Sequence, residues 1–253
     1  MKNKNILAVI VQCRQSSTRL KKKLLLKIGK QKIIDILLNR IKKVHSDLII
    51  CAVAKEPGNE SLLKAIKQNN VAIYEGSKNN VLLRTYRAAK KFKVNTIVRI
   101  TSDQPLIDPK LVNIGIKIFN KKNLDYLSNN IYPSWPHGLD CEAVTFDWLD
   151  KAYFEANKPF EREHVMPWIR NHPNVKKANY ICPHDGIEQH RWTIDNDRDL
   201  QFLRELWKRL PQGEKESLSY CTPLSIVTSE PKLLAINAGQ DRFEGLKKSM
   251  SVS

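Results

Sequence analysis

The amino-acid sequence predicts an α/β fold with a Rossmann-like, mostly parallel sheet that carries helices on both faces. In the first half of the chain, short apolar runs alternate with amphipathic stretches, and this β-α-β-α order builds such a sheet. The chain has 253 residues, 42% of them hydrophobic and 27% charged, so it can bury a sizeable core.

The predicted strands and helices follow one another at short intervals. Apolar runs predict strands over residues 6–12, 48–54, 71–74, 96–100 and 126–128. Apolar residues at helical spacing predict helices over residues 33–44, 60–67, 81–92 and 109–119. Asp108 should be the N-cap of the last helix, with Pro109 in its first turn. Functional residues are expected in loops beyond the carboxyl ends of the strands.

The rest of the chain predicts one main domain and two smaller features. Residues 131–145 (IYPSWPHGLDCEAVT) predict a long loop that leads into another strand and could form a lid or a subunit contact. Beyond residue 210 the pattern predicts helices, including a short one at PKLLAINAG. We therefore expect a main domain over residues 1–210 and a helical extension over residues 211–253.

Composition argues against several classes of protein. No apolar run approaches transmembrane length and the first five residues are too polar for a signal peptide, so we expect a cytoplasmic protein without membrane insertion. Five widely spaced cysteines without a C-x-x-C pair predict neither a disulfide framework nor a zinc site. The net charge of +17 is spread over nearly every predicted helix, which favours a solvated basic surface over specific nucleic-acid recognition.

The loop after the first strand, QCRQSSTRLKKKLL (residues 12–25), is basic and has no glycine. It lacks the Walker and dinucleotide-binding glycine patterns, so neither backbone cradle for phosphate is predicted. Arg14, Arg19 and Lys23 could instead bind phosphate oxygens through their charged side chains. Spacing alone leaves a solvated basic loop as an equal alternative.

Two aspartates stand where the chain is expected to leave a strand. Asp103 lies in VRITSDQPLIDP, and Asp195 lies in HRWTIDNDRDL, where it should follow a short strand and precede a helix. Both could hold Mg²⁺ over one cleft, because magnesium prefers a few carboxylates together with phosphate oxygens and water. A turn or helix-capping role is the alternative for each, and Asp197 or Asp199 could be a helix-start acid.

Together these stretches resemble the cytidylyltransferases that activate ulosonic acids, the family of CMP-3-deoxy-manno-octulosonate and CMP-sialate synthetases. The resemblance is strongest to the spore-coat-polysaccharide branch. It rests on QCRQSSTRLKKK, RITSDQPLIDP, GLDCE, REHVMPWIR and RWTID, which occur in order along nearly the whole chain. One departure is at Lys21 and Lys22, which stand where the branch has Pro-Gly.

The resemblance implies a Mg²⁺-dependent reaction in which a hydroxyl of a 3-deoxy-2-ulosonic acid attacks the α-phosphorus of CTP. Products would be pyrophosphate and a CMP-sugar for surface polysaccharide, made by a homodimer whose nucleotidyltransferase domain spans residues 1–210. Arg14, Lys23 and Asp103 would be catalytic, and Asp103 and Asp195 would bind the metal. The implied nucleotide-binding residues are Gln12, Arg14, Ser17, Arg19, Lys23, Ala52, Ala54, Gly76, Ser77 and Asp103. The implied sugar-acid residues are His137, Gly138, Asp140, Glu142, Glu163 and His164.

Two other functions remain open on the sequence. A glycosyltransferase that uses nucleotide sugars is possible, because DND at residues 195–197 mimics its D-x-D metal motif. A protein that binds nucleotides or polyanions without catalysis would also explain the basic charge.

Overall fold

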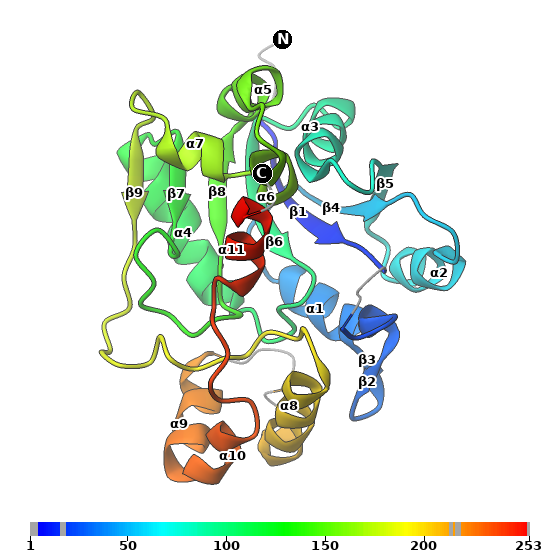
Figure 1. Ribbon diagram of the computed structural model, residues 1–253, viewed down its shortest axis with the longest axis vertical. Coiled ribbons are helices and arrows are strands. Elements are labelled where there is room, and N and C mark those ends of the chain that lie inside the picture. The colour runs from blue at the N-terminus through cyan, green and yellow to red at the C-terminus, as the bar shows by residue number, and fades with distance from the viewer. Residues whose placement is uncertain (1–4, 16–18, 213–214, 216–218, 252–253) are drawn as a thin grey trace.

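The computed structural model describes residues 5–15, 19–212, 215 and 219–251 and is built around one large sheet (Figure 1). The seven strands of this sheet lie in the order β5-β4-β1-β6-β8-β7-β9. Their bounds are β1 (Leu7–Cys13), β4 (Leu48–Ala54), β5 (Ala72–Gly76), β6 (Thr96–Thr101), β7 (Tyr126–Ser128), β8 (Glu142–Thr145) and β9 (Lys177–Asn179). A separate two-stranded ribbon consists of β2 (Lys27–Ile28) and β3 (Gln31–Lys32).

The predicted parallel sheet is confirmed, with one exception in its middle. Strand β1 pairs in parallel with β4 and β6, and β4 pairs in parallel with β5. Strand β8 lies antiparallel between β6 and β7. The predicted strands 48–54 and 126–128 have the observed bounds, and the other three differ by one or two residues. The long loop predicted over residues 131–145 does lead into a strand, but this strand, β8, already occupies the last four residues of the predicted range.

The helices cover both faces of the sheet. Their bounds are α1 (Ile33–Ile41), α2 (Glu60–Gln68), α3 (Val81–Lys91), α4 (Pro109–Lys122), α5 (Phe146–Glu155), α6 (Pro159–His164), α7 (Pro167–Asn171), α8 (Asp197–Arg209), α9 (Cys221–Ser229), α10 (Pro231–Ala235) and α11 (Glu244–Ser251). The predicted cap of α4 is confirmed, because Asp108 Oδ1 accepts hydrogen bonds from the N–H groups of Lys110 and Leu111 at 2.7 and 3.3 Å, with Pro109 at the helix start.

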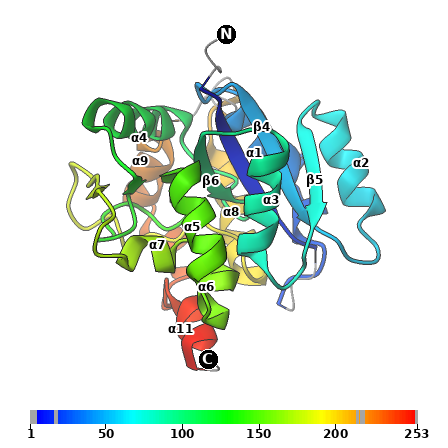
Figure 2. The same ribbon diagram turned by 90° about the horizontal axis from the view of Figure 1, so that it is seen from above.

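Alternate side chains of the central strands feed two separate cores. Val9 and Val11 of β1 pack into the core that contains buried residues of α1, α2, α4 and α8. Ala8 and Ile10 pack into the other core, with buried residues of α3, α5 and α7. Helices α3 and α5 lie side by side on one face of the sheet (Figure 2). Strands buried on both faces read as continuous apolar runs, which is why the sequence predicted them.

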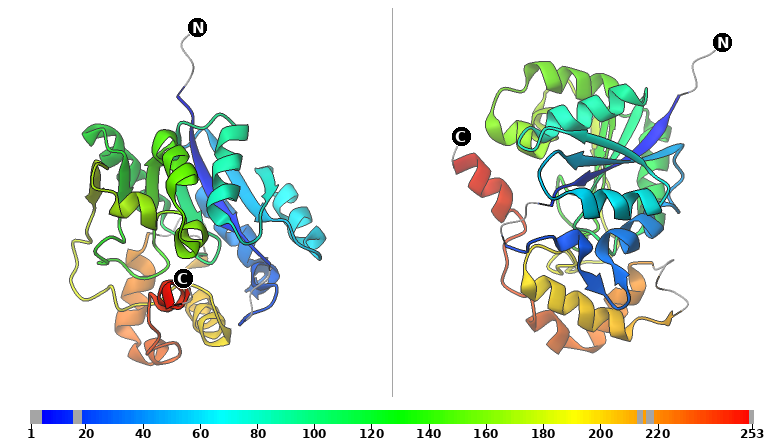
Figure 3. Two further views of the ribbon diagram at one scale, coloured as in Figure 1. Left: turned by 45° about the horizontal axis from the view of Figure 1, so that its top comes forward. Right: turned by 90° about the vertical axis from the view of Figure 1, so that its right-hand side faces the viewer.

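Helices α8, α9 and α10 form a smaller layer beside the sheet (Figure 3). Helix α8 packs against β2, α9 and α10, while α11 lies apart from them, against α6. In the described part of the chain, no helix is long and apolar enough to cross a membrane.

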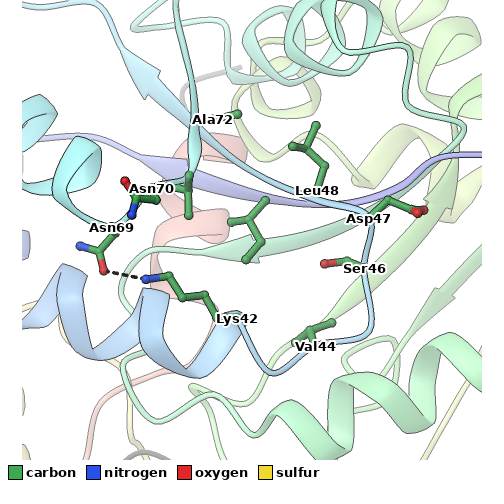
Figure 4. Close-up of a pocket in the computed structure, with 10 residues that line it drawn as sticks. Lys42, Val44, Ser46, Asp47, Leu48, Asn69, Asn70 and Ala72 are labelled. Atoms are coloured by element: carbon green, nitrogen blue, oxygen red, sulfur yellow. Dashed lines mark hydrogen bonds between the residues drawn. The ribbon is translucent and has the colours of Figure 1, made fainter.

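An open hollow lies at the amino ends of the parallel strands, between the ends of α1 and α2 (Figure 4). Lys42 donates a hydrogen bond from Nζ to Asn69 Oδ1 at 3.3 Å on one side of it. Asp47 and Leu48 line the other side, at the start of β4. The hollow is therefore at the opposite edge of the sheet from the loops predicted to carry function.

Candidate active site

The basic loop turns back toward the sheet immediately before Lys23. Lys22 adopts a left-handed backbone, with φ 53° and ψ 31°, and a short 3₁₀ helix follows at Lys23–Leu25. Glycine adopts this conformation most easily, so lysine keeps the turn at a cost of about 1 kcal/mol. The turn points the Lys23 side chain inward, and only 6% of that side chain is exposed.

Lys23 joins the two predicted metal-binding aspartates. Its Nζ lies 3.3 Å from Asp103 Oδ2 and 3.2 Å from Asp195 Oδ1, and it donates a 2.8 Å hydrogen bond to the carbonyl of Ile194. The backbone draws the two segments together, because Ile194 N–H donates to the carbonyl of Asp103 at 2.9 Å. The structure thus brings Lys23, Asp103 and Asp195 to one point at the carboxyl edge of the sheet.

The Asp103 carboxylate is held in its charged form. Burial alone would raise the pKa of Asp103, but the charge of Lys23 and a 2.6 Å hydrogen bond from Thr101 Oγ1 lower this pKa to about 2. Asp103 is therefore an anion at any pH at which the protein would work, and it can attract a cation.

Asp195 is positioned by a buried network around Arg191. Arg191 Nη2 donates to Asp195 Oδ2 at 2.7 Å, and Arg191 Nε donates to Asp199 Oδ1 at 2.9 Å. Asp199 also closes a capping box with Asn196 at the start of α8, so it is the helix-start acid. The predicted short strand before Asp195 is wrong: it is reduced to one isolated parallel bridge between Arg191 and His137, because the backbone N–H of Ile194 bonds to the carbonyl of Asp103 instead of continuing a ladder.

The outer part of the basic loop faces the same site. Arg19 Nη2 lies 3.8 Å from Asp195 Oδ1, and Arg19 Nη1 lies 2.8 Å from Glu244 Oε2. Arg14 is exposed at the end of β1. Burial is the main cause that lowers the pKa of His164, and the charge of Arg14 adds to this lowering. Ser17, the other predicted phosphate-binding residue, lies outside the described residues.

Four of the predicted nucleotide-binding residues, Ala52, Ala54, Gly76 and Ser77, lie at the ends of β4 and β5. Ala52 and Ala54 are fully buried in β4, and Gly76 ends β5, where a Cβ atom would lie 2.8 Å from the Tyr74 ring. Ser77 follows, and its Oγ accepts a hydrogen bond from Asn80 N–H at 3.1 Å. This corner is therefore tightly built, with no room for a side chain at residue 76.

Gln12 is tied into a buried polar chain in the middle of the sheet. Its Nε2 donates to Thr85 Oγ1 at 3.1 Å, and its Oε1 accepts from Arg99 Nη2 at 2.9 Å. Arg99 also pairs with Glu142, which in turn accepts a 2.6 Å hydrogen bond from Tyr126. The chain thus connects Gln12, predicted to bind nucleotide, with Glu142, predicted to bind the sugar acid.

The predicted sugar-acid loop packs directly against the segment that carries Asp195. Arg191 Nη1 donates to His137 Nδ1 at 3.1 Å, which leaves the ring proton on Nε2, 3.7 Å from Asp140 Oδ2. Asp140 also pairs with Arg242. Glu163 and His164 come from α6 instead and meet at Ser249, at 2.8 and 3.1 Å. The predicted sugar-acid residues therefore form two groups, one on the loop that contains His137 and Asp140 and one on α6.

Gly138 makes the close contact between these segments possible. Its φ is +113°, and a Cβ atom there would lie 2.6 Å from the backbone carbon of Trp192. Gly138→Ala should therefore lower the free energy of unfolding in urea by about 2 kcal/mol or more. Gly186→Ala is the matched control, because Gly186 has a φ of +77° but open space around it. Equal losses in the two variants would contradict the contact.

Three histidines near the site are held neutral. Burial lowers the pKa of His137, His164 and His190 below the ordinary value of 6.5, although neighbouring carboxylates oppose it. As pH falls through 6.5 the unfolded chain gains protons that the folded chain resists, so stability should fall. The urea midpoint is expected to be lower at pH 5.5 than at pH 7.5. An unchanged or higher midpoint at pH 5.5 would contradict this assignment.

The donor set fits a divalent cation that is shared with a phosphate. Asp103 and Asp195 reach one ammonium nitrogen, so their carboxylates can also reach one ion. Within the residues that the structure describes, no group of three or more His, Cys, Asp or Glu side chains could hold a metal. An ion bound by these two carboxylates would have to complete its shell with water and phosphate oxygens, as Mg²⁺ does.

Three arginines that shape the site were not expected as functional residues. Arg191 links Asp195 to His137, and Arg242 links Asp140 to the carbonyl of Trp135. Arg84 donates from Nε to the carbonyl of Ala52 at 3.2 Å and from Nη1 to the carbonyl of Ser77, so it joins the ends of β4 and β5 at the predicted nucleotide-binding residues. Only Arg191 lies in one of the stretches that carry the family resemblance, RWTID, and this position could have marked it as a functional residue.

A mostly parallel sheet with helices on both faces is the fold of nucleotidyltransferases, and this chain is one of them. The family model described as cytidylyltransferase matches residues 8–222, and the chain belongs to this family.

Two relatives cover most of the chain. An uncharacterized protein of Methanocaldococcus jannaschii, MJ1063, is 38% identical over 204 residues, which is 79% of this chain and 82% of that protein. The spore coat polysaccharide biosynthesis protein SpsF of Bacillus subtilis is 28% identical over 236 residues, or 90% of this chain and 96% of that protein.

Solved structures show the same fold. A cytidylyltransferase from Leptospira borgpetersenii superimposes with a TM-score of 0.86 at 26% identity, covering 94% of this chain and 100% of that one. CMP:2-keto-3-deoxy-manno-octonic acid synthetase, solved with CTP, has a TM-score of 0.64 at 14% identity and covers 81% of this chain and 99% of its own. The latter likeness concerns the fold alone.

Proposed function

We propose that the protein transfers CMP from CTP to a sugar acid of the 3-deoxy-2-ulosonic type and releases pyrophosphate. The observation that carries this proposal is the meeting of Lys23 with Asp103 and Asp195, beside Arg19, at the carboxyl edge of the sheet. The similarity to a spore coat polysaccharide protein supports a role in surface polysaccharide synthesis. An enzyme that consumes CTP would work in the cytoplasm.

The residues divide the work between binding and electrostatics. Arg14, Ser17, Arg19 and Lys23 would hold the triphosphate, because guanidinium and ammonium groups pair with phosphate oxygens. Asp103 and Asp195 would bind Mg²⁺, which when present neutralises charge on the phosphates. The corner at Ala52, Ala54, Gly76 and Ser77 would receive cytosine and ribose, with Gln12 behind it.

The acceptor would lie between the sugar-acid loop and α6. Asp140, Glu142 and Glu163 can accept hydrogen bonds from sugar hydroxyls, and neutral His137 and His164 can donate one or accept one. Gly138 lets the loop approach the backbone of Trp192 closely, and Arg191 links His137 of this loop to Asp195. Holding the hydroxyl against the α-phosphorus would supply most of the rate enhancement.

We also propose that the protein acts as a homodimer, with residues 131–145 at or near the contact. Tyr132 and Ile181 are large apolar side chains that remain 74% and 68% exposed. Both lie beside edge strand β9, where Asn179 Nδ2 donates to the carbonyl of Tyr132 at 3.2 Å. Sedimentation equilibrium should give twice the mass of the chain, and a monomer mass at all concentrations would contradict the dimer.

A pyrophosphate-release assay tests the activity. The protein is incubated with Mg²⁺, each of the four nucleoside triphosphates and a panel of 3-deoxy-2-keto acids. We expect release with CTP and at least one acid, and none when the acid is omitted. A thermal-shift screen distinguishes this activity from that of a glycosyltransferase. Stabilisation by CTP supports the proposal, whereas stabilisation by a UDP- or GDP-sugar alone would indicate a glycosyltransferase.

A further inference from the structure

Helix α11 contacts residues assigned to both substrates. Glu244, at its start, lies 2.8 Å from Arg19 of the basic loop. Ser249, five residues further along the helix, donates to Glu163 Oε2 at 2.8 Å and lies 3.1 Å from His164 Nε2. In Figure 1 the helix, in red, lies next to α6, and the two elements are in contact.

The contact with Arg19 resembles the contact a phosphate would make. A carboxylate and a phosphate both offer paired oxygens to a guanidinium group, and Arg19 cannot satisfy both with the same N–H groups. Arg19 and Glu244 side chains are 45% and 40% exposed, so water competes with their pairing. An exposed ion pair of this kind is held weakly and can exchange partners.

The segment before α11 is held much more firmly. Asn237 is 3% exposed and donates to the carbonyl of Arg191 at 2.9 Å. Arg242 donates to the carbonyl of Trp135 at 2.7 Å and pairs with Asp140, and both side chains of this pair are mostly buried. The tail therefore has a buried anchor over residues 237–242, followed by a helix whose ion pair with Arg19 is exposed to water.

We propose that α11 is an internal competitor for the triphosphate subsite: Glu244 occupies Arg19 in the free protein, and CTP displaces it. The inference rests on the proposed function, because it assumes that Arg19 binds the triphosphate. The anchor keeps α11 beside the site after displacement. When Glu244 leaves Arg19, the helix moves, and Ser249 loses its contacts with Glu163 and His164. Nucleotide binding therefore frees these two residues for the acceptor.

Titration with CTP measures the competition. Glu244→Gln removes the negative charge that pairs with Arg19. The Kd of this variant for CTP should therefore be about twofold to fivefold lower than the Kd of the unaltered protein. Glu230→Gln is the matched control, because Glu230 is a 45% exposed partner of Arg209 at 2.7 Å. The control should bind CTP as the unaltered protein does. An equal or higher Kd for Glu244→Gln would overturn the inference while leaving the proposed function standing.

Hydrogen exchange gives a second readout that does not depend on the variant. Saturating CTP should increase amide exchange in residues 244–251 of the unaltered protein, since the helix loses its contacts with Arg19 and α6. Slower exchange with CTP would mean that α11 closes over the nucleotide, and would overturn the inference. If neither the unaltered protein nor Glu244→Gln binds CTP at all, the proposed function itself fails.

Discussion

Asp103→Asn is expected to lower kcat for CTP-dependent pyrophosphate release by about 100- to 1,000-fold. Asparagine has nearly the same shape, but it carries no charge for a metal or for Lys23, which lies 3.3 Å away. Because the native carboxylate has a pKa of about 2, the loss should be the same throughout the neutral range of pH. Steady-state kinetics at saturating CTP measures it.

Asp185→Asn is the control for this substitution. Asp185 is an exposed aspartate in the loop that precedes the Asp195 segment, so its loss should leave kcat unchanged. Both variants should have the circular dichroism spectrum of the unaltered protein. In Asp103→Asn, the oxygen of the introduced amide can still accept the hydrogen bond from Thr101 Oγ1. If Asp103→Asn kept more than about a tenth of kcat, Asp103 would not belong to the reaction centre.

Arg191→Ala should cause the largest loss of stability, about 3 to 5 kcal/mol in urea unfolding. The reason is Asp199, whose side chain is 0% exposed and would keep its charge without its guanidinium partner. Arg191→Lys should restore little of this, because an ammonium group cannot pair with Asp195, Asp199 and His137 in the same fixed plane. Activity should fall as well, since Asp195 loses its 2.7 Å hydrogen bond.

Arg209→Ala provides the comparison for Arg191. Arg209 also pairs with two carboxylates, those of Glu205 and Glu230, but all three side chains are about a third or more exposed. Its removal should lower the free energy of unfolding far less than the removal of Arg191 does, because water competes for both of its carboxylate partners. Similar losses for the two arginines would show that burial of the Arg191 network contributes nothing.

The sheet and the meeting of the two aspartates were predictable from local patterns. Strands buried on both faces are continuous apolar runs, and the residues after parallel strands share one edge of the sheet. Asp103 therefore could be placed from its position after an apolar run alone. Asp195 lies beside Asp103, as expected, even though the strand predicted before it does not form, because the Ile194 N–H and the Thr193 hydroxyl both donate to the carbonyl of Asp103 and hold that segment.

Contacts between distant segments could not be predicted in this way. Arg191 is one basic residue among many in a chain of charge +17, and only folding shows that Asp195 and Asp199 share it. Glu244 and Arg19 are 225 residues apart, so no periodicity relates them. Lys22 shows the same limit locally, since its left-handed backbone runs against the preference of a lysine and is imposed by the turn.

Phosphorus NMR of one reaction mixture tests the central claim most directly. The protein is incubated with CTP, Mg²⁺ and 3-deoxy-manno-octulosonate, and then with related 2-keto acids in turn. Transfer of CMP predicts one phosphodiester signal and one pyrophosphate for each CTP consumed with an accepted acid, and far less of both products from Asp103→Asn in the same time. Formation of CDP with inorganic phosphate, or intact CTP with every acid tried, would contradict it.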